Sequence, residues 1–295
     1  VQILHEGLGF DGLYEKLSSF LLMAMGIPAR IFATLLRIAP GRTRNWMWKW
    51  WYQRLAKAHG RADFRFMNYG YKDGKELKLL KEDEPNRLFI QLYNMNIRDV
   101  DLKGKEVVEV GCGRGGGASW IAKAYNPKRL TAFDFSKDAI GLASNWYSSQ
   151  KNLSFKVGNA EDLPLKDNSK DIIYNVESSH CYGNVEAFVK EVYRSLKAGG
   201  NFCWTDFRDK ESMEKLHKIF MKAGFEIVSK KEITKEVLDA LDDINATKVK
   251  GINESVPMGM KKSFETFAGV QGTPVYEAFK AGNLHYHRYL MVKPE

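Results

Sequence analysis

The feature that most constrains the fold is residues 105–119, which read KEVVEVGCGRGGGAS. Three β-branched valines favour a buried strand, and a glycine-rich turn and a helical pattern from about Ala118 follow it. Five of the seven residues at 111–117 are glycine, which suggests that a ligand approaches the backbone closely there. A strand, a glycine turn and a helix place backbone N–H groups at the carboxyl edge of a parallel sheet, where open α/β folds bind ligands.

From residue 105 onward, apolar runs and amphipathic stretches alternate in the manner of a doubly wound sheet. Strands are expected at 106–110, 129–134, 153–157, 171–176, 201–206, 225–232 and 284–292. Helices are expected at about 117–125, 136–149, 184–196 and 211–223. A further helical stretch is expected before the last strand. Seven strands with helices between them predict an α/β core over residues 101–295, with substrate-region insertions toward the C-terminus.

Residues 1–100 are expected to form an N-terminal helical cap that controls substrate access. The apolar run at 17–29 is interrupted and shorter than the about 20 residues that a spanning helix needs, and it lacks the basic leader of a signal peptide. Residues 16–62 contain no Asp or Glu but nine Lys or Arg, together with closely spaced tryptophans. Such a segment suits contact of residues 16–61 with an anionic membrane surface, or a cap whose aromatic side chains pack on the core; the cap is favoured.

Composition narrows the class of protein. The chain has 295 residues, 44% of them hydrophobic, and a net charge of +9, and no recognition fold supports a nucleic-acid partner. Its three cysteines are too few for a disulfide scaffold, so reduced thiols and a cytoplasmic or membrane-surface location are expected. No metal is expected, because CxxC and HxxxH spacings are absent and His285 and His287, on one strand face, lack a third ligand.

Two segments precede the first strand. Residues 61–74 (RADFRFMNYGYKDG) are rich in aromatic side chains, so Tyr69 and Tyr71 could close over a ligand or pack in the core. Acids and a proline at 82–86 predict a helix start, and helical spacing continues through 87–100. Helices placed before the first strand can close a ligand site from above.

The glycine turn admits two kinds of ligand. Gly111, Gly113 and Gly116 satisfy the G-x-G-x-x-G pattern of dinucleotide-binding folds, so a nicotinamide oxidoreductase is one alternative. Glu109, two residues before the first glycine, would repel a pyrophosphate but could support a cation. Asp134, at the end of the second strand, suits ribose hydroxyls in either case.

Five ordered motifs favour the second kind of ligand. EVGCGRGGG, the acid Asp134, GNAEDLPL, DIIYNVESSHCY and LKAGG together resemble the class I S-adenosylmethionine-dependent methyltransferases over about residues 80–230. Within that superfamily, DEPNR, EVGCGRGGGAS and NVESSHCY are most similar to the phthiotriol and phenolphthiotriol dimycocerosate O-methyltransferases and related natural-product O-methyltransferases. The resemblance implies a Rossmann-like seven-stranded sheet with an N-terminal helical cap, and S-adenosyl-L-methionine as the cofactor.

The resemblance also implies which residues bind the cofactor: Glu109, Gly111, Cys112, Gly113, Asp134, Phe135, Asn159, Ala160, Glu161 and Asn175. The first four would hold the methionine end, and Asp134 would accept hydrogen bonds from both ribose hydroxyls. Phe135 would lie beside the adenine, residues 160–161 would border its amine, and Asn175 would lie beside the sulfonium. The family usually has Asp where this chain has Asn159, whose amide oxygen can still accept that hydrogen bond.

The loop after the fourth strand carries the expected catalytic groups. A hydroxyl acceptor must lose its proton during methyl transfer, and histidine is the side chain best suited to accept it near neutral pH. His180 is therefore the expected general base, with packing of the loop as its alternative role. Glu177 is the rival base, an orienting partner for the histidine, or a cap. Tyr182, with Tyr69 and Tyr71, is expected near the substrate or in a lid.

These interpretations predict an S-adenosylmethionine-dependent O-methyltransferase that acts on a hydroxyl of a hydrophobic, lipid-like or polyketide-derived small molecule. One alternative is a C- or N-methyltransferase of the same fold that acts on a quinone, a sterol or a phospholipid headgroup. Another is a catalytically silent cofactor-binding scaffold. Sequence does not name the acceptor, because acceptor specificity is built from regions that vary on a shared fold.

Overall fold

The structure is a computed structural model that describes residues 65–295, apart from residue 76 and residues 257–260. The basic, tryptophan-rich block and most of the expected cap at 1–100 lie outside the described residues. The predicted helix before the first strand is present as α4 (Arg87–Ile97), which follows a short 3₁₀ helix, η2 (Glu84–Asn86). It ends three residues before the expected position.

One mixed sheet organises the described chain, with strand order β3-β2-β1-β4-β5-β7-β6. The strands are β1 (Glu106–Val110), β2 (Arg129–Asp134), β3 (Leu153–Val157), β4 (Lys170–Val176), β5 (Leu196–Arg208), β6 (Glu226–Glu232) and β7 (His285–Val292). The first five strands pair in parallel, and the order reverses between β1 and β4. Ligands of open α/β sheets bind at this kind of switch point, beyond the carboxyl ends of the strands.

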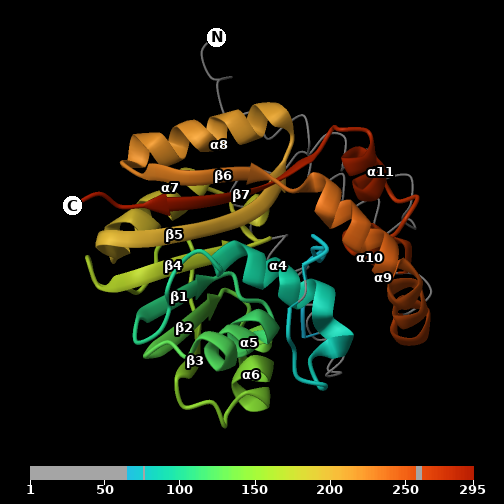
Figure 1. The fold of residues 1–295 in the computed structure, drawn as a ribbon, viewed down its shortest axis with the longest axis horizontal. Coiled ribbons are helices and arrows are strands. Elements are labelled where there is room, and N and C mark those ends of the chain that lie inside the picture. Colours follow the sequence, from blue (N-terminus) through green and yellow to red (C-terminus); the bar gives the residue numbers. More distant parts are fainter. Residues whose placement is uncertain (1–64, 76, 257–260) are drawn as a thin grey trace, which may run out of the picture.

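Helices cover both faces of the sheet (Figure 1). They are α5 (Gly116–Tyr125), α6 (Lys137–Trp146), η3 (Ser179–Cys181), α7 (Val185–Ser195), α8 (Lys210–Ala223), α9 (Thr234–Ser255), α10 (Lys261–Phe267) and α11 (Pro274–Lys280). On one face, α7 and α8 pack with Val108 and Val110 in a single apolar cluster. On the other face, α4, α5, α9 and α11 pack with Val107 in a second cluster. Burial on both faces explains why β1 is a nearly continuous run of valine.

Local signals place the ends of the helices. Ser136, Asn184 and Asp209 precede α6, α7 and α8, and each side chain accepts a hydrogen bond from a backbone N–H in the first turn. Such caps satisfy donors that have no partner within the helix. Gly224 ends α8 in the left-handed conformation that glycine adopts without strain.

The seven predicted strands are all present, so the expected α/β doubly wound architecture is confirmed. Two features of the sheet differ most from the sequence-based expectation. β5 begins at Leu196 instead of 201, because the Leu196–Gly200 stretch pairs with the start of β4 through an irregular register. β7 runs antiparallel to both neighbours and lies between β5 and β6.

None of the helices in the described ranges is long and apolar enough to cross a bilayer.

Candidate active site

The glycine turn joins the ends of two parallel strands. The N–H groups of Gly111 and Cys112 both donate to Phe133 O, at 2.8 and 3.0 Å. Gly113 N donates to Asp134 Oδ2 at 2.8 Å, and the other carboxylate oxygen accepts from Ser136 N at 2.9 Å. The half-buried Asp134 carboxylate is thus held rigidly at the end of β2, and burial raises its pKa to about 6.

The five glycines of this turn serve different purposes. A Cβ at Gly111, Gly115, Gly116 or Gly117 would overlap protein atoms of Ser178, Phe155, Arg65 or Tyr93 respectively. Only at Gly113 would a Cβ have room, with Met67 Sδ the nearest atom at 3.4 Å. The density of glycine therefore reflects close packing inside the protein at four positions. Only Gly113 leaves its Cβ position open to a ligand.

Glu109 lies underneath the turn and is completely buried. Its two carboxylate oxygens accept hydrogen bonds from Tyr93 of α4 and Tyr174 of β4, each at 3.0 Å. Burial raises its pKa to about 8, although the two tyrosine hydroxyls oppose this shift. Glu109 therefore links β1, β4 and α4 directly beneath the candidate cofactor position.

Asn175 lies at the carboxyl end of β4, next to the point where β1 ends and the glycine turn begins. Its Nδ2 donates to Val110 O at 2.8 Å and to Ser178 Oγ, which lies 2.7 Å away. Tyr182 Oη lies 2.9 Å from the same Ser178 hydroxyl. Asn175 Oδ1 is buried and has no hydrogen-bond partner in the described part of the chain. An unsatisfied buried acceptor here fits a ligand that carries N–H donors, such as the ammonium of the methionine end of S-adenosyl-L-methionine.

Beyond the turn, the structure places a buried acid against the predicted base. His180 Nδ1 lies 2.8 Å from Asp206 Oδ1, and the backbone N–H of His180 donates to Oδ2 of the same carboxylate at 3.0 Å. Asp206 is fully buried near the end of β5, where Ser179 Oγ and Arg208 also contact it, at 2.8 and 3.2 Å. The His180 imidazole remains partly accessible, with 24% of its side chain exposed.

The pKa values of the pair follow from this arrangement. Burial disfavours the carboxylate of Asp206, but the positive charges of His180 and Arg208 hold its pKa well below the usual value. Burial also disfavours the imidazolium of His180, but the electrostatic influence of Cys181 and Asp206 holds its pKa well above the usual value. Asp206 was not among the residues singled out from the sequence. The available signal was its place at the end of a strand, as for Asp134.

Glu177 lies in the same loop with a different set of partners. Its carboxylate accepts from Tyr69 N, at 3.0 and 3.1 Å to the two oxygens, and from Tyr286 Oη at 2.7 Å. Its backbone has a φ of 45°, an uncommon value for a residue with a side chain. Burial raises its pKa to about 7. Asp206, and not Glu177, is the carboxylate that contacts His180 Nδ1. The carboxylate of Glu177 instead binds the backbone of the segment that contains Tyr69.

The other residues singled out from the sequence, except Tyr71, lie around this centre. Phe135 is half-buried after β2, and Asn159 is exposed, with Oδ1 accepting from Glu161 N at 3.2 Å. Glu161 Oε1 accepts from the N–H groups of residues 183 and 184, at 2.9 and 3.0 Å, which ties the turn at 159–162 to the loop after β4. Tyr71 is buried on the outer side of α4, where Lys231 Nζ lies 3.4 Å from its hydroxyl. Ala160 is half-buried in the same turn.

The sheet order, the glycine turn and the acid at the end of β2 define a class I S-adenosylmethionine-dependent methyltransferase. The family model described as "Methyltransferase domain" matches residues 108–204. Solved structures with the same fold include the cyclase SpnF, at a TM-score of 0.60 and 19% identity, covering 77% of this chain and 87% of that one. The geranyl diphosphate C-methyltransferase of Streptomyces coelicolor A3(2) matches with a TM-score of 0.59 and 17% identity. The match covers 82% of this chain and 97% of that one.

Closer relatives specify the family. The phthiotriol/phenolphthiotriol dimycocerosates methyltransferase of Mycobacterium tuberculosis is 32% identical over 90% of this chain and 98% of its own length. The fatty-acid O-methyltransferase of Mycolicibacterium smegmatis is 33% identical over 79% of this chain and 84% of its own. The chain belongs to the family of the phthiotriol/phenolphthiotriol dimycocerosates methyltransferases. The predicted class of enzyme and its cofactor, S-adenosyl-L-methionine, are thereby confirmed.

Proposed function

We propose that this methyltransferase transfers the methyl group to a hydroxyl oxygen of a lipid-like or polyketide-derived molecule. The observation that carries the proposal is the pairing of His180 with the buried Asp206 at the carboxyl ends of β4 and β5. Relatives named for O-methylation or for dimycocerosate lipids support it. A histidine held by a carboxylate suits removal of the proton that a hydroxyl oxygen must lose when it becomes a methyl ether.

In the proposed reaction, the cofactor, Asp206 and His180 each have a separate role. S-adenosyl-L-methionine supplies an activated methyl group when it is bound. Asp206 accepts the Nδ1–H of His180 and so leaves Nε2 as the atom that takes the proton of the acceptor hydroxyl. The hydroxyl oxygen then forms the new bond to the methyl carbon, and the products are a methyl ether and S-adenosylhomocysteine. Much of the remaining rate acceleration comes from alignment of the acceptor.

An aromatic cluster beside His180 supports a hydrophobic acceptor. The Phe207 ring lies 4.6 Å from the His180 ring, and Tyr69 stacks on Phe207 at 5.5 Å. Phe279 of α11 and Tyr286 of β7 pack against Phe207 at 5.3 and 5.9 Å. These rings come from four separate segments that converge at the carboxyl edge of the sheet. Apolar walls with a few placed polar groups are typical of small-molecule sites.

The decisive experiment compares two histidine variants with labelled cofactor and lipid or polyketide extracts. His180→Ala is expected to lower kcat by about 10²–10⁴-fold, with the affinity for S-adenosylhomocysteine unchanged. His285→Ala is the matched control, because His285 pairs with Glu232 at 3.0 Å on the far side of β7. Near-normal turnover by His180→Ala would instead support C- or N-methylation. Cofactor binding without turnover of any acceptor would support the scaffold alternative.

We further propose that the region before residue 101 acts as a cap over the core at 101–295. Ile90, Leu92 and Ile97 of α4 are fully buried against the sheet, so α4 must stay with the core in any truncation. Removal of residues 1–60 is therefore the appropriate test of the basic block. Loss of binding to anionic vesicles would support membrane contact through residues 16–61, and unchanged binding would leave the block as a cap alone.

A further inference from the structure

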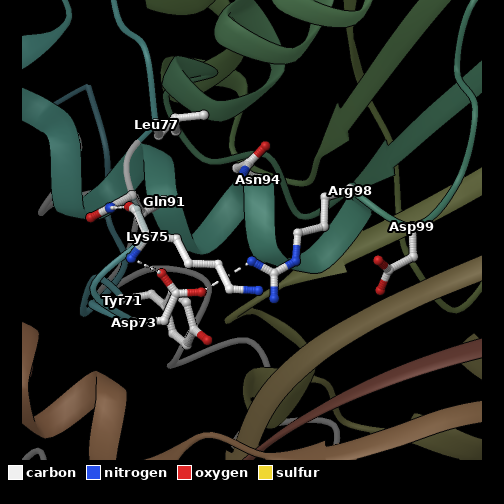
Figure 2. Close-up of a pocket in the computed structure, with 8 residues that line it drawn as sticks. All are labelled: Tyr71, Asp73, Lys75, Leu77, Gln91, Asn94, Arg98 and Asp99. Carbon is white, nitrogen blue, oxygen red and sulfur yellow. Dashed lines mark hydrogen bonds and ion pairs between the residues drawn. The ribbon is translucent and has the colours of Figure 1, made fainter.

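A cavity of about 390 Å³ lies beside α4 (Figure 2). Its lining residues are Tyr71, Asp73, Lys75, Leu77, Gln91, Asn94, Arg98 and Asp99. The first four alternate along the segment 71–77, and the others come from α4 and the two residues after it. The opposite face of α4 carries Tyr93, which donates to Glu109 beneath the glycine turn. Cavity and methyl-transfer site therefore lie on opposite faces of one helix.

The charges of this cavity do not balance. Figure 2 shows the side chains of Lys75 and Arg98 extending toward each other near the carboxylate of Asp73. That carboxylate accepts from Arg98 Nη1 and from the backbone N–H of Lys75, both at 3.1 Å. The other acid, Asp99, forms an ion pair with Arg288 at 2.8 Å. Arg98 is thus the ion-pair partner of Asp73, and the ammonium of Lys75 has no counterion among the described residues.

The polar groups that remain available are mainly donors, apart from Gln91 Oε1, a buried acceptor without a partner among the described residues. Arg98 uses only Nη1 on Asp73, and the ammonium of Lys75 makes no ion pair with any described residue. The Oδ1 of Asn94 already accepts from Tyr125, which leaves its Nδ2 to donate. Arginine and lysine donors directed at one space suit a carboxylate or a phosphate.

We propose that this cavity binds a small molecule that carries one oxyanion, a phosphate ester or a carboxylate, through Lys75 and Arg98. The volume exceeds what a bare phosphate ion fills, so the ligand includes a carbon part. Tyr71 and Leu77 provide an apolar wall for that part. The site is independent of the acceptor site, so the proposal does not depend on the identity of the methyl acceptor.

Calorimetric titration of the full chain at low salt tests this inference with glycerol 3-phosphate, inorganic phosphate and lactate as probes and choline as the cationic control. Saturable binding of at least one organic oxyanion, and none of choline, is expected. Lys75→Met should weaken that binding about three- to fivefold, because one partly screened charge is lost. The preferred probe then distinguishes a phosphate from a carboxylate ligand.

Lys72→Met is the matched control. It removes the same charge three residues away, but Lys72 pairs with Asp243 at 2.6 Å and does not line the cavity. Both lysines are exposed, so both variants should unfold at the wild-type temperature. Absence of saturable binding for every oxyanion probe would overturn the proposal. Equal weakening by the two variants would also overturn it, because it would reveal a response to net charge alone.

Discussion

At the scale of single residues, the pair of His180 and Asp206 sets the expected pH dependence of catalysis. A base must be neutral to accept a proton, so kcat/KM should rise with pH through the pKa of His180, which lies above the usual value. Asp206→Asn removes the negative charge that helps raise this pKa. The acid limb of the pH profile should therefore move to lower pH, while the maximal rate falls. An unchanged acid limb, in a variant that still binds S-adenosylhomocysteine, would contradict the pairing.

The glycines allow a second test at this scale. Gly117→Ala should destabilise the fold by about 1–3 kcal/mol, because its Cβ would overlap the Tyr93 ring. Gly113→Ala should lower the free energy of unfolding by about 1–2 kcal/mol, because alanine is strained at the left-handed φ of 52°. It should also weaken S-adenosylhomocysteine binding. Gly141→Ala, inside α6 with open space around it, should stabilise by about 0.5–1 kcal/mol. Urea unfolding and calorimetry measure the two effects separately. Equal cofactor affinity in the Gly113 and Gly141 variants would contradict the assignment of Gly113.

At the scale of elements, the segment at 65–72 lies across the carboxyl edge of the sheet. It is joined to the glycine turn through Gly116 N and Arg65 O at 3.2 Å, and to the catalytic loop through Tyr69 N and Glu177. Glu177→Ala should therefore speed hydrogen exchange of the Tyr69 amide roughly tenfold or more, since its hydrogen bond is lost. Mass spectrometry of the peptide that covers this segment measures the change.

A second glutamate near this segment provides the control for that experiment. Glu236 is hydrogen-bonded to the segment through its backbone carbonyl, which accepts from Lys72 N at 3.0 Å. Its side chain pairs with Lys231 at 2.7 Å. Glu236→Ala should therefore leave exchange of the Tyr69 amide unchanged. The attachment through Glu177 would be disproved if both variants exchanged at the wild-type rate.

At the scale of the whole molecule, buried carboxyl groups should make stability depend on pH. Burial raises the pKa of Glu109 to about 8 from its ordinary 4.5, so the folded chain keeps a proton that the unfolded chain releases. The contribution of Glu109 to the free energy of unfolding therefore declines as pH rises from about 4.5 to about 8, by about 1.4 kcal/mol per pH unit. Glu177 and Asp134, with pKa values of about 7 and 6, act in the same direction.

One buried base, His287, and one half-buried base, Lys248, limit the pH range over which this trend can be measured. His287, with a pKa of about 4, acts in the opposite direction below pH 6.5, and Lys248, with a pKa of about 7, does so above pH 7. Urea unfolding between pH 5 and 7 should nevertheless show falling stability. Glu109→Gln, which has no titrating group, should show a shallower decline by roughly 1 kcal/mol per pH unit. Identical slopes in the variant and the wild type would refute the burial of an uncharged Glu109.

Much of the fold was predictable because its signals are local. Each strand is a short apolar run bounded by turn residues, and caps such as Ser136 and Asp209 mark where helices begin. The antiparallel insertion of β7 between β5 and β6 was not predicted. Its position depends on the path of residues 233–284 and on pairing between strands far apart in the chain, and neither leaves a local signal.

The candidate site likewise contains residues that were predictable from the sequence and residues that were not. Asp134 was found because an acid that ends the strand after a glycine turn follows a spacing rule. Asp206 was missed because its partnership with His180 arises only where the ends of β4 and β5 meet, 26 residues apart in sequence. The cavity beside Arg98 was missed as well, because it forms between α4 and a segment without regular structure.

The amino-acid order alone therefore specifies the doubly wound sheet and the glycine turn, since periodicity and motif spacing are properties of neighbouring residues. The class of cofactor followed from the resemblance of the ordered motifs to a known family. Within the glycine turn, the sequence does not separate Gly113, whose Cβ position is open, from the four glycines that pack against protein. Packing makes that distinction, because Phe155, Tyr93 and the Arg65 carbonyl reach the turn from three other segments. Folding also unites His180 with Asp206 and forms the charged cavity, since both require contacts between distant parts of the chain.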